Sequence, residues 1–286
     1  MSTYAESGYS SAGYATGRPT YSPKSPDFLV KYHKQIEANE CGHVLDVATG
    51  TGIFARLISD RFRETTATDI SKVMLESAAQ PAKGKIEYIQ GSAEDMSIIP
   101  DKSVDMVTVA TGAHWFNSTK FLTEAKRVLK PNGTLAIFGY SGFGYFPKSP
   151  KCDKIMREFC MDKLGDYWDK GRNNLERLYS NYNIKTRQMG FKDVYHGVYP
   201  QQATHYTGCD SVVMDAPNII DFKMTWKSLL KYLQTMSCVH NYHVEFPDER
   251  NVAEVAVERM MHEAGESDWD SILDFIWEQS VVLCRC

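Results

Sequence analysis

The apolar residues between positions 44 and 138 repeatedly change their spacing, from short runs that suit buried strands to the three-or-four spacing of helices. Runs that predict strands fall at 44–47, 65–70, 86–89, 104–109 and 135–138. The clearest helix between them is amphipathic, with apolar residues at Phe121, Leu122, Ala125, Val128 and Leu129. Strands that alternate with helices form a parallel sheet through right-handed crossovers. We therefore predict an α/β fold of the doubly wound class.

Segments on either side of this region extend the predicted sheet. Ser25-Pro26-Asp27 predicts the start of a helix that ends before Gly42. Beyond Tyr140, two further strand-like segments lie at 193–195 and 272–283. We therefore expect a mostly parallel sheet of seven strands. Helical stretches in this second half are expected at 151–163, 172–187, 225–238 and 249–263.

Composition and charge exclude several classes of partner. The net charge is −4 and the basic residues are scattered, so we expect no nucleic-acid partner. The chain has no apolar run long enough to span a membrane and no signal pattern in its first residues, which predicts a cytoplasmic protein without a membrane partner. Seven cysteines without a Cys-x-x-Cys pair predict reduced thiols. His240 and His243 have no further ligand pair, so no metal is expected.

The segment from Asp46 to Gly52 follows the first strand directly and opens the first helix. Its glycines, Gly50 and Gly52, let a ligand come close to the backbone, and the helix start offers N–H groups. Asp69 ends the second strand, where a carboxylate can accept hydrogen bonds from both hydroxyls of a ribose. This pattern predicts a site for adenosine with a free ribose.

The pattern alone leaves other interpretations open. The run Gly50-Thr51-Gly52-Ile53-Phe54-Ala55 also satisfies the dinucleotide motif of dehydrogenases, although the chain lacks a Tyr-x-x-x-Lys pair of the short-chain dehydrogenase kind. Each residue also has a structural explanation. The glycines could mark a tight turn, Asp46 could cap that turn, and Asp69 could cap the second helix.

Three further features resemble the class I S-adenosylmethionine-dependent methyltransferases. They are Asp46 four residues before Gly50, Ala93-Glu94-Asp95 after the third strand, and the segment 129–133 before the fifth. The resemblance implies S-adenosylmethionine as cofactor, with adenine at the loop after the third strand and the methionine moiety at the glycine loop. Ala48 departs from the commonest family form, which has glycine there. The implied cofactor-binding residues are Tyr14, Arg18, Asp46, Ala48, Gly50, Gly52, Asp69, Ile70, Met74, Ala93, Glu94 and Thr111.

A narrower resemblance, to the fungal trans-aconitate methyltransferases and their small-molecule relatives, covers most of residues 9–283. It is carried by Ala113-His114-Trp115-Phe116, by Tyr14 with Arg18-Pro19-Thr20-Tyr21, by Tyr167-Trp168 with Gly171-Arg172, and by Trp277 in the final strand. Residues 196–222 and 249–263 match this group poorly, and acceptor identity could differ there. The resemblance implies one domain, 1–286. Residues 1–25 would form a flexible lid that orders over the cofactor, 26–140 the cofactor-binding half, and 141–286 the substrate half with a helical cap.

The narrower resemblance also implies O-methylation of a small carboxylic acid. An ionised carboxylate attacks a sulfonium without a general base, so a lack of any Ser/His/Asp constellation is expected. The implied acceptor contacts are His114, Trp115, Tyr140, Trp168 and Arg172, where Arg172 could hold a carboxylate through two hydrogen bonds. No catalytic residue is assigned. The alternatives are a surface arginine, tryptophans that only pack, and a structural histidine.

Two other functions stay open at this point. One is methylation of an amine, phenol or thiol of another small natural product, in which the acceptor needs deprotonation. The other is a non-catalytic relative that binds the cofactor or a partner without turnover. We expect a small-molecule acceptor and favour a monomer.

Overall fold

The structure, a computed structural model, describes residues 17–142, 144–169, 171–220 and 223–286. These residues form two compact units. The sheet unit comprises the described residues of 21–141, 173–220 and 278–286, and the helical unit those of 17–20, 142–172 and 223–277. Most of the predicted lid, including Tyr14, lies outside the described residues. The division at 25/26 and 140/141 stays a prediction.

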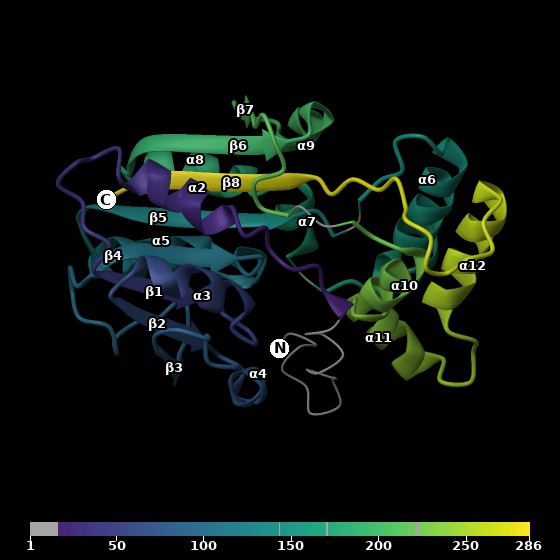
Figure 1. Cartoon of the computed structure of the whole chain (residues 1–286), viewed down its shortest axis with the longest axis horizontal. Helices are drawn as coiled ribbons and strands as arrows, with labels where there is room; N and C mark the ends of the chain where they lie inside the picture. Colours follow the sequence, from purple (N-terminus) through teal and green to yellow (C-terminus); the bar gives the residue numbers. More distant parts are fainter. Residues whose placement is uncertain (1–16, 143, 170, 221–222) are drawn as a thin grey trace. The chain divides into compact units, whose positions relative to one another are not determined.

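One sheet of eight strands runs through the sheet unit in the order β3-β2-β1-β4-β5-β8-β6-β7 (Figure 1). β8 pairs antiparallel with both of its neighbours, β5 and β6, and the other neighbours pair parallel. The strands are β1 (His43–Val47), β2 (Glu64–Asp69), β3 (Ile86–Gln90), β4 (Val104–Ala110), β5 (Leu129–Tyr140), β6 (Lys192–Tyr199), β7 (Val212–Val213) and β8 (Gln279–Arg285). The predicted mostly parallel α/β sheet is confirmed.

The predicted number of seven strands is wrong, because β7 adds an eighth. β7 has two residues and lies at the edge of the sheet inside the segment 196–222. Two residues are too few to produce an apolar pattern in the sequence.

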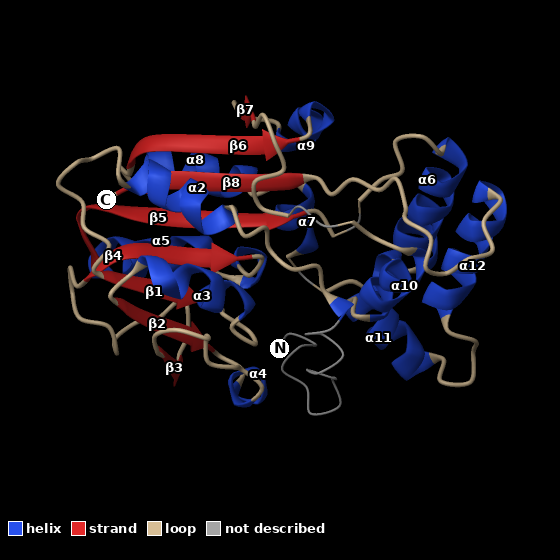
Figure 2. Cartoon of the chain, in the orientation of Figure 1, coloured by secondary structure: helices blue, strands red, loops and turns tan. Residues whose placement is uncertain are grey.

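Helices cover both faces of the sheet (Figure 2). α2 (Ser25–His33) and α3 (Ile53–Ile58) lie on the face toward the viewer, and α5 (Ser118–Val128) and α8 (Ser180–Gln188) on the far face. α4 (Lys72–Glu76) packs against β2 and β3. The four residues of the predicted stripe within α5 are fully buried, which confirms the amphipathic helix; they are Phe121, Leu122, Ala125 and Val128. The shorter elements of the sheet unit are η2 (Ser59–Arg61), η3 (Ala113–Trp115), η6 (Gln201–Ala203) and α9 (Thr204–Thr207).

β5 is longer than the predicted strand at 135–138 and includes Pro131, Asn132 and Gly133. β5 starts at Leu129, which pairs with Val104, and its next partner pair is Thr134 with Met106. The intervening residues therefore bulge out of the ladder, with Asn132 at φ 64°. A bulge absorbs the extra residues without ending the strand.

The helix predicted over 172–187 is two helices, α7 (Arg172–Glu176) and α8. Leu178 and Tyr179 between them both have left-handed backbones, with φ 51° and 58°. Neither residue is a glycine, so this conformation is strained and must be held by the surrounding structure.

The helical unit contains α6 (Pro150–Arg157), a π-helix at Glu158–Lys163, η5 (Gly165–Tyr167), α10 (Trp226–Gln234), α11 (Ser237–Glu245) and α12 (Val252–Ala264). α12 packs against both α6 and α10. The single helix predicted over 225–238 is wrong, because Met236 is extended and separates α10 from α11. In the part of the chain that the structure describes, no helix has both the length and the apolar character needed to cross a bilayer.

The strand predicted over 272–283 begins only at Gln279. Trp277 therefore precedes β8 and belongs to the helical unit, where its ring contacts those of Tyr232 and Phe275. In this segment Leu273 and Trp277 are buried and Ile272 is exposed, and isolated bridges join Ile272 to Thr225 and Ile276 to Tyr145. The alternating pattern therefore belongs to an extended segment that pairs at single residues rather than to a strand of the sheet.

Candidate active site

The loop between β1 and α3 holds the two predicted glycines in different environments. Both have positive φ, 57° at Gly50 and 74° at Gly52. A Cβ on Gly50 would have no atom within 4 Å, whereas a Cβ on Gly52 would lie 2.3 Å from the Tyr88 hydroxyl oxygen. Gly50 therefore leaves open space for a ligand beside the backbone, and Gly52 is required by packing. Between them, the buried Thr51 hydroxyl has no hydrogen-bond partner among the described residues.

Asp69 ends β2 and is nearly buried beside this loop. Its two carboxylate oxygens accept backbone hydrogen bonds, one from Gly50 N and one from Ser71 N, both at 2.8 Å. Burial raises the pKa of this carboxyl, and the backbone donors oppose that shift. Each carboxylate oxygen can accept more than one hydrogen bond, so these contacts orient Asp69 without exhausting its acceptors.

Asp46 is the last residue but one of β1 and is fully buried. Its carboxylate accepts hydrogen bonds from the hydroxyls of Thr49 and Thr108, each at 2.6 Å. Burial raises its pKa to about 6, with the two threonines acting in the opposite direction. In this structure Asp46 ties the glycine loop to β4, and its predicted contact with the cofactor stays a prediction.

Two residues with left-handed backbones lie at the same edge of the sheet. Ala48 after β1 and Thr111 after β4 are non-glycine residues, and both have φ 54°. Strained residues of this kind gather where a site must be held in one geometry. The left-handed backbone at Ala48 also explains why glycine is the commoner residue at this position in the family that the sequence resembles.

The predicted adenine side of the site exposes one large apolar side chain. Ile70 follows Asp69 and is 68% exposed, an unusual degree for a large apolar residue. Met74 on α4 is buried, and Ala93 packs against the core beneath the sheet. Glu94 accepts a hydrogen bond from Asn117 N at 2.7 Å, which fixes the loop after β3 to the start of α5.

The N-terminal segment is divided between the two units. In the sheet unit, the Tyr21 hydroxyl donates to Thr111 Oγ1 at 3.0 Å, and its ring packs edge-on against Phe54 and Phe138. In the helical unit, Arg18 donates to the Thr235 carbonyl oxygen at 3.2 Å. The predicted role of Arg18 toward the cofactor stays a prediction.

On the acceptor side of the sheet unit, α8 supports the turn that contains His114. Tyr179, fully buried, lies with its hydroxyl 3.2 Å from His114 Nδ1. Tyr182 donates to the Ala113 carbonyl oxygen at 2.7 Å. Sequence reasoning missed both tyrosines, since no motif links them to a turn more than 60 residues away. Trp115 packs on the His114 ring at 4.7 Å between ring centres.

Three of the predicted acceptor residues, His114, Trp115 and Tyr140, belong to the sheet unit. Tyr140 ends β5 and is buried. The other two, Trp168 and Arg172, belong to the helical unit.

Within the helical unit, Arg172 and Trp168 form a stacked pair. The Arg172 guanidinium lies 4.3 Å from the centre of the Trp168 ring. Trp168 Nε1 donates to the Cys160 carbonyl oxygen at 2.9 Å, and Arg172 reaches the same oxygen at 3.5 Å. The two predicted side chains are thus brought together and oriented by one backbone group.

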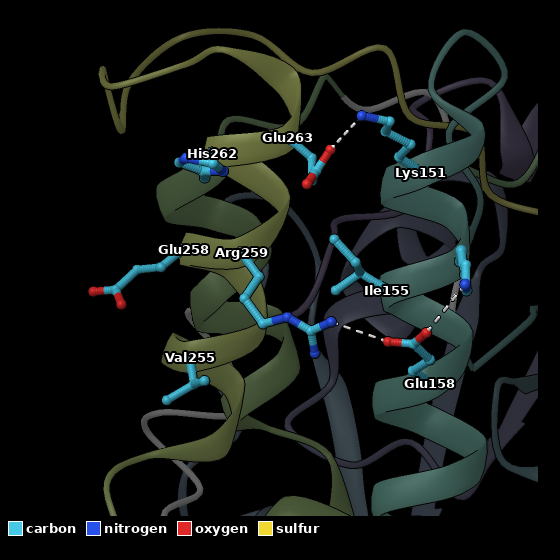
Figure 3. A pocket seen from close by; sticks show the side chains of 9 residues that line it. Lys151, Ile155, Glu158, Val255, Glu258, Arg259, His262 and Glu263 are labelled. Atoms are coloured by element: carbon cyan, nitrogen blue, oxygen red, sulfur yellow. Dashed lines mark hydrogen bonds and ion pairs between the residues drawn. The ribbon is translucent and has the colours of Figure 1, made fainter.

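The helical unit also has a groove of about 530 Å³ between α6 and α12 (Figure 3). Its charged side chains pair across the groove, Lys151 with Glu263 at 2.8 Å and Arg259 with Glu158 at 3.0 Å. None of the predicted site residues is among the residues that line it. Among the described residues, no three His, Cys, Asp or Glu side chains gather as a metal site.

Comparison with known proteins identifies similar proteins for the part of the sheet unit from β1 to β5 and for the chain as a whole. The methyltransferase domain family matches residues 45–137, from β1 to β5. The chain is 23% identical to a probable S-adenosylmethionine-dependent methyltransferase of Saccharomyces cerevisiae, over 99% of this chain and 98% of the relative. It is 31% identical to an uncharacterized methyltransferase of Schizosaccharomyces pombe, over 51% of this chain and 57% of that relative.

Among solved structures, a putative type II methyltransferase from Anaeromyxobacter dehalogenans has a similar fold. The TM-score is 0.66 and the identity 20%, over 94% of this chain and 97% of the bacterial one. At this identity the likeness concerns the fold.

Proposed function

We propose that this S-adenosylmethionine-dependent methyltransferase transfers the methyl group to the carboxylate of a small organic acid and so forms a methyl ester. The activity and the cofactor rest on the domain match at residues 45–137 and on the full-length relative. The acceptor, and the residues that bind it, are the proposal.

The residues at the ends of β1 and β2 fit S-adenosylmethionine. The open space beside Gly50 suits the methionine moiety, which would lie against the backbone there. The oriented carboxylate of Asp69 suits the ribose, and the exposed side chain of Ile70 suits the adenine ring. When bound, the cofactor supplies an electrophilic methyl group on a sulfonium. The chain's own contribution is then to bind, orient and exclude water.

The observation that supports a carboxylate acceptor is the way Arg172 is held. Stacking on Trp168 and the contact with the Cys160 carbonyl oxygen fix the plane of the guanidinium. A fixed guanidinium binds a planar carboxylate through parallel hydrogen bonds and loses little side-chain entropy when it does so. The acid is ionised at neutral pH, so its attack needs no base from the protein.

A second acceptor class is favoured by a different observation. The buried contact between His114 and Tyr179 places an imidazole, a group that can accept a proton near neutral pH, after β4. An amine, phenol or thiol acceptor would need such a group.

Identification of the labelled product tests the proposal. The protein is incubated with methyl-labelled S-adenosylmethionine and a metabolite extract, and labelled species are found by mass spectrometry. Mild base should remove the label, because esters hydrolyse readily and ethers, amines and thioethers do not. A base-stable label would contradict the carboxylate proposal and favour the second class.

We expect Arg172→Lys to lower kcat/KM for the acceptor by about ten-fold or more, because lysine keeps the charge but loses the planar pair of donors. Arg172→Ala should be worse by a further margin. The affinity for S-adenosylhomocysteine, measured by calorimetry, should change little. Arg259→Lys, an exposed arginine of the same unit paired with Glu158, is the matched control. Parental rates in both Arg172 variants would make Arg172 a structural residue only.

A further inference from the structure

Cys209 lies in the segment 196–222, whose role the sequence left unexplained, and it has a histidine and an asparagine around its sulfur. The Sγ atom lies 3.7 Å from His196 Nδ1. Asn183 Nδ2 donates to the same sulfur at 3.3 Å. The three side chains come from β6, α8 and the loop before β7, all within the sheet unit.

The hydrogen bonds of His196 determine which ring nitrogen faces the thiol. His196 Nε2 lies 2.8 Å from the Leu178 carbonyl oxygen. A carbonyl oxygen only accepts, so Nε2 carries the proton. Burial lowers the pKa of His196, which keeps the ring neutral. Nδ1 is therefore the unprotonated nitrogen and accepts from the Cys209 thiol.

The orientation of Asn183 is fixed in the same way. Arg187 Nε donates to Asn183 Oδ1 at 3.0 Å, so the amide presents its NH₂ group on the other side. That group donates to the Cys209 sulfur and, at 3.0 Å, to the Asp210 carbonyl oxygen. The amide therefore holds the sulfur in place beside His196 Nδ1.

Cys209 is partly exposed, and the neighbouring Gly208 has open space where a side chain would stand. Cys41 and Cys286 are partly exposed to a similar degree, but burial raises the pKa of both. The thiol of Cys286 donates to the Lys126 carbonyl oxygen, which is not a base. The remaining four cysteines are buried.

We propose that Cys209 is a nucleophilic thiol, activated by His196, and a site of exchange with low-molecular-weight disulfides. His196 Nδ1 takes the thiol proton, and the Cys209 thiolate attacks one sulfur of the disulfide. A bond forms between Cys209 Sγ and that sulfur, and the bond between the two disulfide sulfurs breaks. The leaving thiolate takes the proton from His196. One disulfide bond breaks and one forms, and one thiol replaces another, so no further oxidant or reductant is needed.

The test measures mixed-disulfide formation on the full chain under native conditions. The protein is incubated with oxidised glutathione near neutral pH and quenched with acid. Peptides that contain Cys41, Cys209 and Cys286 are then quantified by mass spectrometry. The initial rate at Cys209 should exceed the rates at the other two by about ten-fold or more, because only Cys209 has a base at its thiol. Equal rates at the three cysteines would overturn the proposal.

Two variants separate activation by His196 from simple exposure. His196→Gln keeps an N–H donor for the Leu178 carbonyl oxygen but has no base, so the rate at Cys209 should fall about ten-fold while Cys41 and Cys286 keep theirs. Asn183→Asp keeps the acceptor for Arg187 and replaces the donor at the sulfur with a carboxylate oxygen, so it should also slow Cys209. Thermal unfolding and S-adenosylhomocysteine binding confirm the fold of each variant. If His196→Gln does not fold, Asn183→Asp decides, and an unchanged Cys209 rate in a folded variant overturns the proposal.

Discussion

Replacement of Asp69 by alanine is expected to weaken S-adenosylmethionine binding by about 1.5–3 kcal/mol, which is roughly 10- to 150-fold in Kd. The carboxylate is the charged acceptor predicted for the ribose hydroxyls. It also accepts hydrogen bonds from Gly50 N and Ser71 N. Its loss therefore leaves these two backbone N–H groups without their partner. Calorimetric titration with S-adenosylhomocysteine measures the change.

The control for this prediction is Asp60→Ala, which removes an exposed carboxylate on η2, beyond the far end of α3 from the glycine loop. It should leave the affinity unchanged. Circular dichroism and the melting temperature should show that Asp69→Ala stays folded. An affinity equal to that of the parent would rule out the ribose assignment.

Gly52→Ala is expected to destabilise the folded protein by about 2–3 kcal/mol. A left-handed alanine costs about 1–2 kcal/mol. The new Cβ would also lie 2.3 Å from the Tyr88 hydroxyl oxygen, which must move and give up its 2.7 Å hydrogen bond to the Ala79 carbonyl oxygen, a loss of about 1 kcal/mol. Chemical denaturation measures the free energy of unfolding.

Gly50→Ala is the matched control, because Gly50 also has positive φ but open space around its Cβ position. It should cost only the backbone strain, about 1–2 kcal/mol. In a Tyr88→Phe background, Gly52→Ala should cost less than in the parent, since the nearest clashing atom is gone. If Gly50→Ala and Gly52→Ala cost the same, the contact with Tyr88 does not explain the glycine.

The alternation of strands and helices from β1 to β5 could be predicted from the sequence because its signals are local. A buried strand, a glycine turn and a helix follow one another directly in the chain at 44–58. The acid at the end of β2 has a known offset from that turn. Parallel strands then bring their carboxyl ends to one edge, where Asp46 contacts Thr108 across 62 residues. The stripe on α5 was equally readable, since 3.6-residue periodicity is a property of the segment itself.

Elements whose boundaries depend on distant partners were predicted less well. The bulge in β5 is defined only by its register with β4, and β7 exists only because β6 lies beside it. The segment before β8 has the apolar pattern of a strand, but it pairs through isolated bridges and its Trp277 ring packs on Tyr232 of α10. A sequence pattern indicates that a segment is buried. The tertiary structure decides which helices or strands it packs against.

The sequence by itself thus determined the α/β class, and it predicted a methyl-donor site with Gly50, Gly52 and Asp69 as its principal residues. Only the tertiary structure decided which glycine is required by packing, and that Tyr179 holds His114. It also brought Cys209 to His196 and Asn183. The physical reason is that these contacts join α8, β6 and loops through space, and no fixed spacing along the chain encodes the direction of a side chain in another element.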